Sequence, residues 1–248
     1  MGFYADQVLP RAMDVVMRSG EYTVIRARVA AGLSGDVLEV GFGSGLNVAH
    51  YPATVTRVLA VDPATVGRKL AAPRVAARTL PVEYLGLDGQ SLPLPAESVD
   101  HALTTWTLCT IPDVELALRE INRVLRTGGT LHFMEHGRSP DANVARWQDR
   151  LTPMQRRIAG GCHVNRPIDK LIAGSGPGRD ADGHVLPAWA QGVRLQLRRR
   201  RHQETANPIV ASACRARPLS TSPTASILRR HLVNRGLLSW SMSRNDVW

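Results

Sequence analysis

Short runs of β-branched and aliphatic residues alternate with segments of helical periodicity through the first part of this chain. This alternation is typical of a doubly wound α/β domain, in which helices cover both faces of one mostly parallel sheet. The predicted strands are residues 37–40, 57–61, 82–86, 99–105 and 130–135. We therefore expect a Rossmann-like sheet with a ligand crevice at the carboxyl ends of its strands.

The clearest predicted helix spans residues 113–126, because its apolar residues form one face and its charged residues the other. The pair Gly128 and Gly129 is expected to end it. Residues 3–31 are predicted to form one or two amphipathic helices, and a further helix is predicted near residues 167–174. The apolar side of the first helix is expected to consist of Val8, Leu9, Met13, Val16 and Met17.

The positive charge of the chain is concentrated near its C-terminus. The 248 residues carry a net charge of +10, yet residues 1–174 hold 19 Lys and Arg against 17 Asp and Glu, whereas residues 175–248 hold 12 against 4. All seven Phe and Tyr residues lie at or before Phe133. We therefore predict a helical cap over 1–31, a main domain over 32–174 and a basic, disordered tail over 175–248.

The N-terminus lacks the pattern of a secretion signal. Asp6, Arg11, Asp14 and Arg18 interrupt the segment where a signal peptide needs an apolar core, and no run of eighteen apolar residues occurs. We therefore expect a cytoplasmic protein, with membrane contact limited to a peripheral one through the N-terminal helix. The three cysteines fit neither a disulfide framework nor a C-x-x-C metal motif, which predicts reduced thiols.

A glycine-rich loop follows the first predicted strand. Its glycines Gly41, Gly43 and Gly45 allow a tight turn and let a ligand approach the backbone without meeting a Cβ. The dinucleotide fingerprint needs a third glycine where this chain has Leu46, which argues against a nicotinamide oxidoreductase. The spacing suits a nucleoside ligand without a pyrophosphate, such as S-adenosylmethionine, although a plain structural turn has the same pattern.

Two acidic residues follow the next two strands. Asp62 ends the second strand and Asp88 the third, so both are expected at the edge of the sheet where ligands bind. A carboxylate at the first position can accept both ribose hydroxyls, each bond contributing about 1.5–3 kcal/mol. The second can accept from the exocyclic amine of an adenine. Either acid alone is more often a cap or a turn former, but the two in order behind the glycine loop favour a nucleoside site.

With these motifs in place, residues 30–174 resemble the class I S-adenosylmethionine-dependent methyltransferases. Within them, the chain is similar to the branch that contains the ubiquinone-biosynthesis and alkyl thiol methyltransferase-like proteins. The segments that resemble this branch are residues 41–47, 92–95, 105–111, 119–126, 133–137 and 160–166.

The resemblance implies a role for each matching residue. The three glycines would pass beneath the methionine part of S-adenosylmethionine, Glu39 would lie near its ammonium group, and Asp62 would hold the ribose. Asp88 with Gly89 would hold the adenine, and the segment from Thr105 to Leu108 would line the sulfonium. Such enzymes work mainly by aligning a small acceptor for in-line attack, here a thiol, a quinone-like or a lipid-like molecule.

The acceptor side is less well defined by the sequence. His136, at the end of the fifth predicted strand, is a candidate base or positioning group, with capping or packing as the alternative. Residues 132–136 spell the inverted metalloprotease signature H-x-x-E-H, but that motif needs a helix and the segment is predicted to be a strand, so we expect no metal there and His132 packed under a helix.

Further candidates on the acceptor side have two interpretations each. Cys109 and Cys162 are interpreted as packing residues rather than nucleophiles, because transfer from a sulfonium needs no covalent enzyme intermediate. Trp106 and Trp147 are predicted either to wall an apolar acceptor pocket or to pack in the core.

The chain departs from the resembling family after residue 176, where that fold continues into a β-hairpin. Our hypothesis is that the tail is read out of frame, because shifting the codons of residues 179–198 forward by one nucleotide permits a strand-forming sequence. The hairpin would then be missing, the edge of the fifth strand unpaired, and this form weakly active or inactive. The nucleotide sequence of the gene tests this. The alternatives are a genuine basic tail on an RNA methyltransferase or on a nucleic-acid-binding protein, and nucleic acid is not our expected partner.

Overall fold

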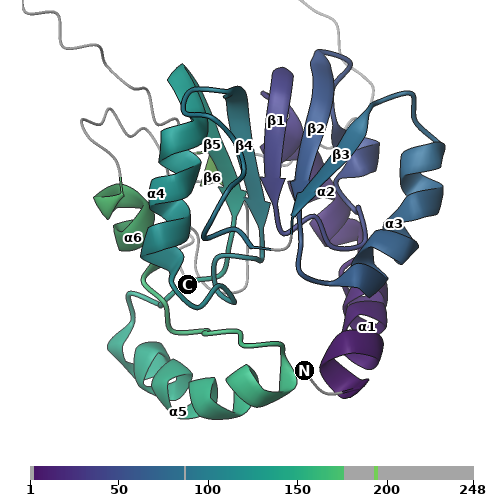
Figure 1. Cartoon of the computed structure of the whole chain (residues 1–248). Coiled ribbons are helices and arrows are strands. Elements are labelled where there is room, and N and C mark those ends of the chain that lie inside the picture. The colour runs from purple at the N-terminus through teal and green to yellow at the C-terminus, as the bar shows by residue number, and fades with distance from the viewer. Residues whose placement is uncertain (1–2, 87, 176–192, 195–248) are drawn as a thin grey trace, which may run out of the picture. The chain divides into compact units, whose positions relative to one another are not determined.

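The computed structural model describes residues 3–86, 88–175 and 193–194. One six-stranded sheet with the order β3-β2-β1-β4-β5-β6 forms its centre, and helices lie on both sides (Figure 1). The neighbouring pairs among β1 to β5 are parallel, and β6 is antiparallel to β5. The strands are β1 (Gly35–Val40), β2 (Val55–Val61), β3 (Val82–Gly86), β4 (Val99–Thr105), β5 (Leu125–Met134) and β6 (Val193–Arg194).

This architecture confirms the predicted doubly wound α/β class and all five predicted strands. The helical elements are a π-helix η1 (Tyr4–Val8), α1 (Leu9–Val16), α2 (Gly20–Ala30), a 3-10 turn η2 (Val48–His50), α3 (Thr65–Ala76), α4 (Val114–Val124), α5 (Ala142–Ile158) and α6 (Ile168–Gly174). No helix among the described residues is both long and apolar enough to cross a membrane.

Alternating residues of the strands fill a core on each face of the sheet. Leu38 and Val40 of β1 point into a cluster that α4 and α6 complete, and Val37 points into another that includes residues of α2 and α3. The apolar face predicted for α4 is buried in the first cluster. Asp113 caps this helix, because its side chain accepts a hydrogen bond from the N–H of Leu116 at 2.9 Å.

Two predictions about the helices are wrong. The glycine pair does not end α4, because the chain turns to extended backbone at Leu125 and β5 runs through Gly128, whose φ is +85°. The register of the β4–β5 pair shifts at this point, so the two glycines accommodate an irregularity within the strand. In the N-terminal helix, Val8, Met13 and Val16 of the predicted apolar side are exposed, and the buried residue of α1 is Asp14.

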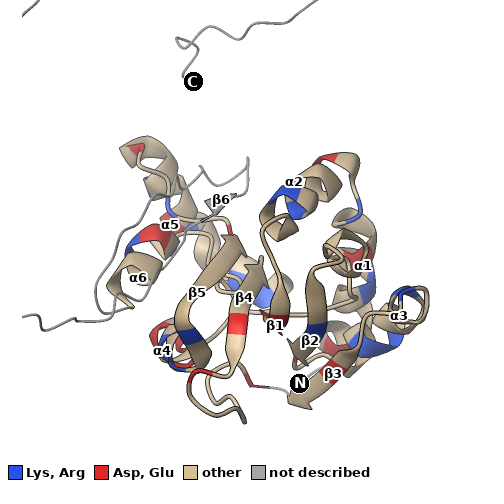
Figure 2. Cartoon of the chain, turned by 90° about the horizontal axis from the view of Figure 1, so that it is seen from above, with Lys and Arg blue, Asp and Glu red and all other residues tan. Residues whose placement is uncertain are grey.

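Asp14 is buried because it joins two helices. Its carboxylate pairs with Arg18 one turn along and, at 3.0 Å, with Arg74 of α3. Arg74 also donates to the carbonyl oxygen of Ser44 in the glycine loop. Figure 2 shows charged residues of both signs on the helices and on several strands. The N-terminal helix α1 is therefore attached by an ion pair to α3, and through Arg74 to the glycine loop.

The edge of β5 is partly paired. His132 and Phe133 pair with Arg194 and Val193 of the short strand β6, so the expectation of a wholly unpaired edge is wrong at these two residues. Their pairing is antiparallel. The frameshift hypothesis and the predicted disorder of the tail concern residues that lie almost entirely outside the described ones.

Candidate functional site at the carboxyl ends of the strands

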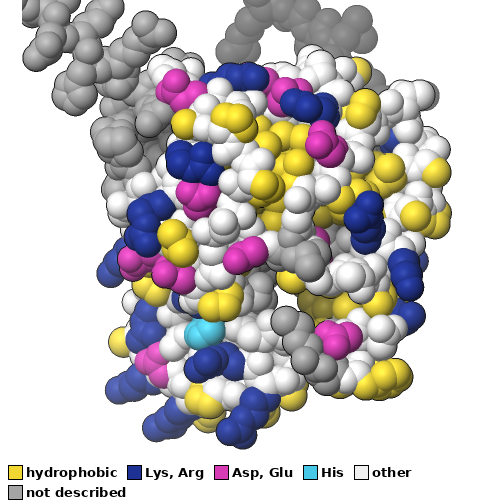
Figure 3. All heavy atoms as spheres, in the orientation of Figure 1, with side chains coloured by type: hydrophobic (Ala, Val, Ile, Leu, Met, Phe, Trp, Pro, Cys, Tyr) yellow, Lys and Arg dark blue, Asp and Glu magenta, His cyan; other side chains and the backbone are white. Residues whose placement is uncertain are grey.

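The parallel strands end at one edge of the sheet, and the predicted site residues gather there. In Figure 1 this edge faces α5 and α1, which lie beyond the tips of the strands. Figure 3, in the same orientation, shows the surface hollowed between that edge and these helices. The carboxyl edge is therefore the place to examine each predicted residue.

The glycine loop follows β1 directly and packs against two other segments. Gly41 has φ +83°, and a Cβ added to it would lie 1.8 Å from Oγ1 of Thr107, just after β4. A Cβ on Gly67 of α3 would lie 2.9 Å from the carbonyl oxygen of Gly43. Gly43 and Gly45 also have positive φ. Glycine is needed here for both the backbone conformation and the close approach of the neighbouring segments.

Asp62 follows β2 and holds the glycine loop. One carboxylate oxygen accepts from the N–H of Gly43 and the other from the N–H of Ala64, both at 2.7 Å. The turn-forming interpretation of Asp62 is therefore confirmed. A carboxylate can accept about four hydrogen bonds, so its oxygens retain capacity for two ribose hydroxyls. Burial raises the pKa of Asp62, against the lowering effect of these two N–H donors.

Asp88 and Gly89 form a turn at the same edge. The carboxylate of Asp88 accepts a hydrogen bond from the N–H of Gln90 at 2.8 Å, which forms the turn. Asp88 remains exposed to solvent. A Cβ on Gly89 would lie 2.8 Å from Cγ1 of Val40, so this turn lies against the end of β1. The structure thus brings Gly41, Asp62 and Gly89 to one edge, in the order that the sequence predicts.

Glu39 is fully buried, with 0% of its surface exposed. It accepts hydrogen bonds from Nδ2 of Asn47 at 2.6 Å and from the hydroxyl of Tyr51. Burial raises the pKa of Glu39 to about 7, although both donors lower it. Its predicted contact with an ammonium group stays a prediction. In this structure the Glu39 carboxylate holds the side chain of Asn47 in place at the edge of the sheet.

Arg26 of α2 completes this buried network and was not predicted from the sequence. Its guanidinium donates to Oδ1 of Asn47 at 2.8 Å and to Oγ1 of Thr105 at 3.1 Å. Burial lowers the pKa of Arg26 to about 10, although Glu39 opposes that shift. The available signal was its place on the helix, because Arg26 lies on the same face as the buried Val29 and Ala30. A buried, hydrogen-bonded arginine thus lies beside the predicted sulfonium-lining residue Thr105.

The segment after β4 has an unusual backbone. Trp106 has φ +52°, a left-handed conformation that is rare for a bulky residue and is common at functional sites. Its ring lies edge-on to Tyr22 at 4.8 Å and beneath the guanidinium of Arg26 at 4.8 Å. Glu135, just after β5, accepts from the N–H groups of Thr107 and Leu108 and so fixes this segment.

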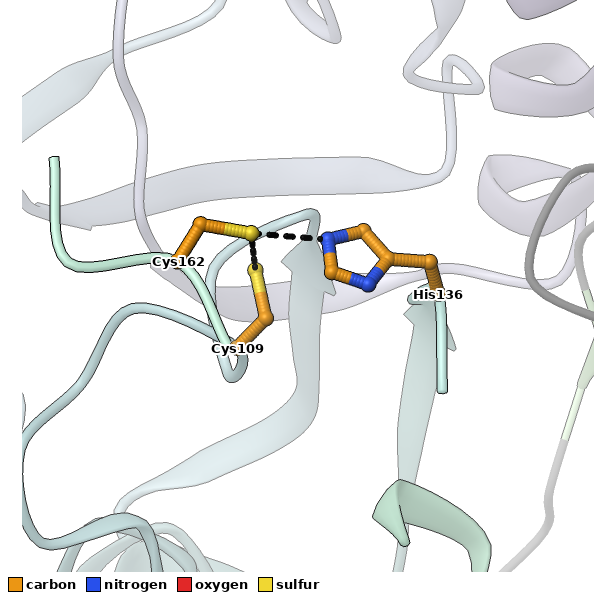
Figure 4. Close-up of side chains that lie close together, drawn as sticks. All are labelled: Cys109, His136 and Cys162. Carbon is orange, nitrogen blue, oxygen red and sulfur yellow. Dashed lines mark hydrogen bonds between the residues drawn. The ribbon is translucent and has the colours of Figure 1, made fainter. Parts of the chain in front are cut away.

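Three side chains from distant segments meet beyond β4 and β5 (Figure 4). Sγ of Cys162 lies 3.7 Å from Sγ of Cys109 and 3.1 Å from Nε2 of His136. The pKa of the Cys162 thiol is lowered, first by its hydrogen bond with Cys109 and then by His136, whereas the pKa of the buried Cys109 thiol is raised. Both thiols are free and buried, which agrees with packing residues, but the sequence did not predict that they meet each other and His136.

Three of the remaining sequence predictions can also be decided. His132 is a fully buried strand residue whose Nδ1 lies 2.8 Å from the carbonyl oxygen of Val29 in α2, so it packs under a helix as predicted. Because residues 125–134 form a strand, the helical geometry that H-x-x-E-H needs is not present. Trp147 is 61% exposed on α5, so the alternative that it packs in the core is wrong.

Comparison with known proteins gives a family match for the middle of the chain. Residues 38–133 match the family model described as a methyltransferase domain. Thiol S-methyltransferase TMT1B of Rattus norvegicus is 35% identical over 140 residues, which are 55% of this chain and 57% of that protein. Thiol S-methyltransferase TMT1A of Homo sapiens is 36% identical over 148 residues, 57% of this chain and 60% of that protein. This chain therefore spans about three fifths of the length of these curated relatives.

Relatives and solved structures of lower identity match a similar part of the chain. Demethylmenaquinone methyltransferase of Roseiflexus castenholzii is 28% identical over 154 residues, 60% of this chain and 64% of that protein. Among solved structures, a protein of Methanococcus maripaludis assigned to the S-adenosyl-L-methionine-dependent methyltransferases superposes with a TM-score of 0.56 at 13% identity, over 81% of this chain and 96% of that one. This structural likeness shows the fold.

Proposed function

We propose, from the premise that residues 38–133 of this chain are a methyltransferase domain, that the protein transfers a methyl group from S-adenosylmethionine to a small apolar acceptor, with a thiol as the preferred class. One observation supports this most: the glycine loop, Asp62 and the Asp88–Gly89 turn lie in order along one edge of the sheet. The two relatives at 35% and 36% identity are thiol S-methyltransferases by name, which favours a thiol over a quinone-like or lipid-like acceptor.

On the cofactor side, each residue has a proposed role. The backbone of Gly41, Gly43 and Gly45 lies beneath the methionine part, where a side chain would block it. Asp62 accepts from the ribose hydroxyls with the oxygen capacity that Gly43 and Ala64 leave free. Asp88 with Gly89 accepts from the adenine. Glu39 orients Asn47 and Arg26 toward the amino-acid end of the cofactor, where the guanidinium can pair with a carboxylate.

On the acceptor side, Thr105 and the segment after it line the methyl group. The methyl group is activated by the positive sulfur that carries it, so the protein mainly aligns the acceptor lone pair with the bond that breaks. A thiol acceptor must also lose its proton, because the thiolate is the nucleophile. His136 is the proposed acceptor-side group.

The rival functions have weaker support. The relatives described above are named for action on a thiol or a quinone precursor, so they give no support to an RNA methyltransferase or a nucleic-acid-binding protein. The oxidoreductase alternative requires a glycine at position 46, where this chain has Leu46.

Calorimetry and a transfer assay together test the proposal. The full chain is expected to bind S-adenosylmethionine more tightly than NAD, and to methylate an alkyl thiol faster than a quinol of similar size. Tighter binding of NAD, or binding of S-adenosylmethionine with transfer only to RNA, would contradict it.

The proposed location is the cytoplasm, with the N-terminal helices in contact with a membrane surface. Phe3 is 77% exposed, and Val15 and Val16 of α1 are exposed as well. Co-sedimentation with neutral lipid vesicles is expected for the intact chain and reduced for the double variant Val15→Ser, Val16→Ser. Equal sedimentation of both proteins contradicts this contact, and cell fractionation tests the location.

A further inference from the structure

Three metal-ligating side chains converge at the acceptor end of the edge without any sequence motif that joins them. Cys109 follows β4, His136 follows β5, and Cys162 lies in the loop after α5. One ligand atom from each, Sγ, a ring nitrogen and Sγ, lies within 4.8 Å of the other two. We propose that Cys109, His136 and Cys162 bind one zinc-type divalent ion.

Two of the three distances between ligand atoms are close to those around a tetrahedral ion. Zinc lies about 2.3 Å from a cysteine sulfur and about 2.0–2.1 Å from a histidine nitrogen, so it separates its two sulfurs by about 3.8 Å and a sulfur from the nitrogen by about 3.5 Å. Here the two sulfurs are 3.7 Å apart, and Cys162 Sγ is 3.1 Å from His136 Nε2. The third pair of ligand atoms, on Cys109 and His136, lies within 4.8 Å, so a rotation that brings the imidazole closer to Cys109 completes the tetrahedral spacing.

The backbone around the three ligands is fixed. The N–H of His163 donates to the carbonyl oxygen of Cys109 at 2.9 Å, which ties the Cys162 loop to the Cys109 loop. Arg166 donates to the carbonyl oxygens of Leu108 and Ile111. Cys109 is 1% and Cys162 is 7% exposed, so the thiols are shielded from solvent. Such preorganised, partly dry ligands are what an ion with two thiolates requires.

A disulfide is the competing interpretation of the two sulfurs. It would use two of the three converging groups and leave the His136 contact unexplained, and it would need an oxidant. Zinc uses all three groups and requires no change of oxidation state.

Among the described residues, no fourth Cys, His, Asp or Glu joins the three. Zinc sites with three protein ligands typically keep the fourth position for water or substrate. Resting on the proposed function, we assign this position to the acceptor thiol, which coordinates as thiolate and releases its proton to solvent. Its sulfur lone pair then forms a bond to the methyl carbon while the methyl–sulfonium bond breaks and that electron pair returns to the cofactor sulfur. The products are a thioether and neutral S-adenosylhomocysteine.

Titration of the full chain with Co²⁺ tests the site, because a thiolate-bound tetrahedral Co²⁺ gives charge-transfer absorption and intense visible bands. One equivalent is expected to bind, and Cys109→Ser, His136→Asn or Cys162→Ser is expected to weaken the affinity at least tenfold. Cys214→Ser is the matched control and is expected to leave the spectrum unchanged. A spectrum without thiolate bands, or an equal loss in the control, overturns the site.

A measurement on the unchanged protein avoids the problem of variants that fail to fold. X-ray absorption of the zinc-loaded chain is expected to show two sulfur neighbours at about 2.3 Å and a nitrogen at about 2.0 Å. A shell of oxygen and nitrogen only overturns the proposal.

The role in thiol binding has its own readout. An alkyl thiol added to the Co²⁺-loaded chain is expected to intensify the charge-transfer band, as a third thiolate joins the ion. An unchanged band overturns the thiol assignment. Metal binding is measured without S-adenosylmethionine, so the two proposals can fail separately. Full thiol methylation by a metal-free chain overturns this inference alone. A chain that binds metal but has no affinity for S-adenosylmethionine overturns the proposed function.

Discussion

The two halves of the strand edge are built in different ways. Around β1 to β3, the glycine loop, Asp62 and Asp88 each follow their own strand directly, so chain order and spatial order agree. Around β4 and β5, Cys109 and Cys162 are 53 residues apart in sequence and meet only through the return of the chain after α5. We refer to these as the cofactor half and the acceptor half. Local motifs reveal the first kind of site, whereas the second depends on which loops return to the same edge.

The largest expected effect separates the two halves. Asp62→Ala should weaken S-adenosylmethionine binding by about 2–4 kcal/mol, because two ribose hydroxyls lose a charged acceptor and Gly43 loses its hydrogen bond. Calorimetry measures the affinity, and Asp149→Ala on α5 is the matched control. Co²⁺ binding by the acceptor half should not change. An unaltered affinity for S-adenosylmethionine would remove Asp62 from the cofactor site.

The buried carboxyl group of the cofactor half should give a pH dependence. The pKa of Glu39 is raised from 4.5 to about 7, so the folded state holds a proton that the unfolded state loses. The free energy of unfolding should therefore fall as the pH rises from about 4.5 to 7, by on the order of 3 kcal/mol. Urea unfolding at several pH values measures this, and Glu39→Gln should remove this contribution but leave that of Glu135, whose pKa burial also raises to about 7. A steeper fall in the variant than in the native chain would contradict it.

A smaller effect is expected from the glycine loop. Gly41→Ala places a side chain at φ +83° and against Thr107, so it should cost about 1–2 kcal/mol from the conformation alone, with a further loss from the overlap. Gly20→Ala is the control, because a Cβ there meets nothing within 4 Å. Thermal unfolding and cofactor affinity should both decline in the first variant only. Comparable losses in both variants would show that the loop is not specially constrained.

The smallest expected effect concerns the helix that lies beyond the edge. Asp14→Asn weakens the pairs with Arg18 and Arg74, and should cost about 1 kcal/mol because both arginines remain partly exposed. Hydrogen exchange should increase in α1, with little change in the acceptor half. Asp6→Asn in η1 is the control. If exchange rises equally in the two variants, Asp14 does not attach the helix.

The fold could be predicted from the sequence because each strand and helix follows from the pattern of its own residues. The five strands could be predicted in this way, and so could the positions of Asp62 and Asp88 at the strand ends. Arg26 was missed because its burial depends on Asn47, which precedes η2, and on Thr105 of β4. The apolar side of α1 was misjudged because the ion pair of Asp14 with Arg74 decides which face points inward. The meeting of Cys109, His136 and Cys162 could not be predicted, since it depends on the path of residues 137–161 rather than on any local pattern.

The unusual backbone of Trp106 has a thermodynamic consequence. Its ring contacts Arg26 in the cofactor half, and its carbonyl oxygen lies 3.7 Å from Sγ of Cys109 in the acceptor half. A ligand that shifts this residue in one half therefore changes the other half as well. Linkage then requires the effect to be reciprocal: the factor by which the donor alters acceptor affinity equals the factor by which the acceptor alters donor affinity. Trp106→Phe should reduce that common factor, and the order in which the two substrates are added cannot change its value.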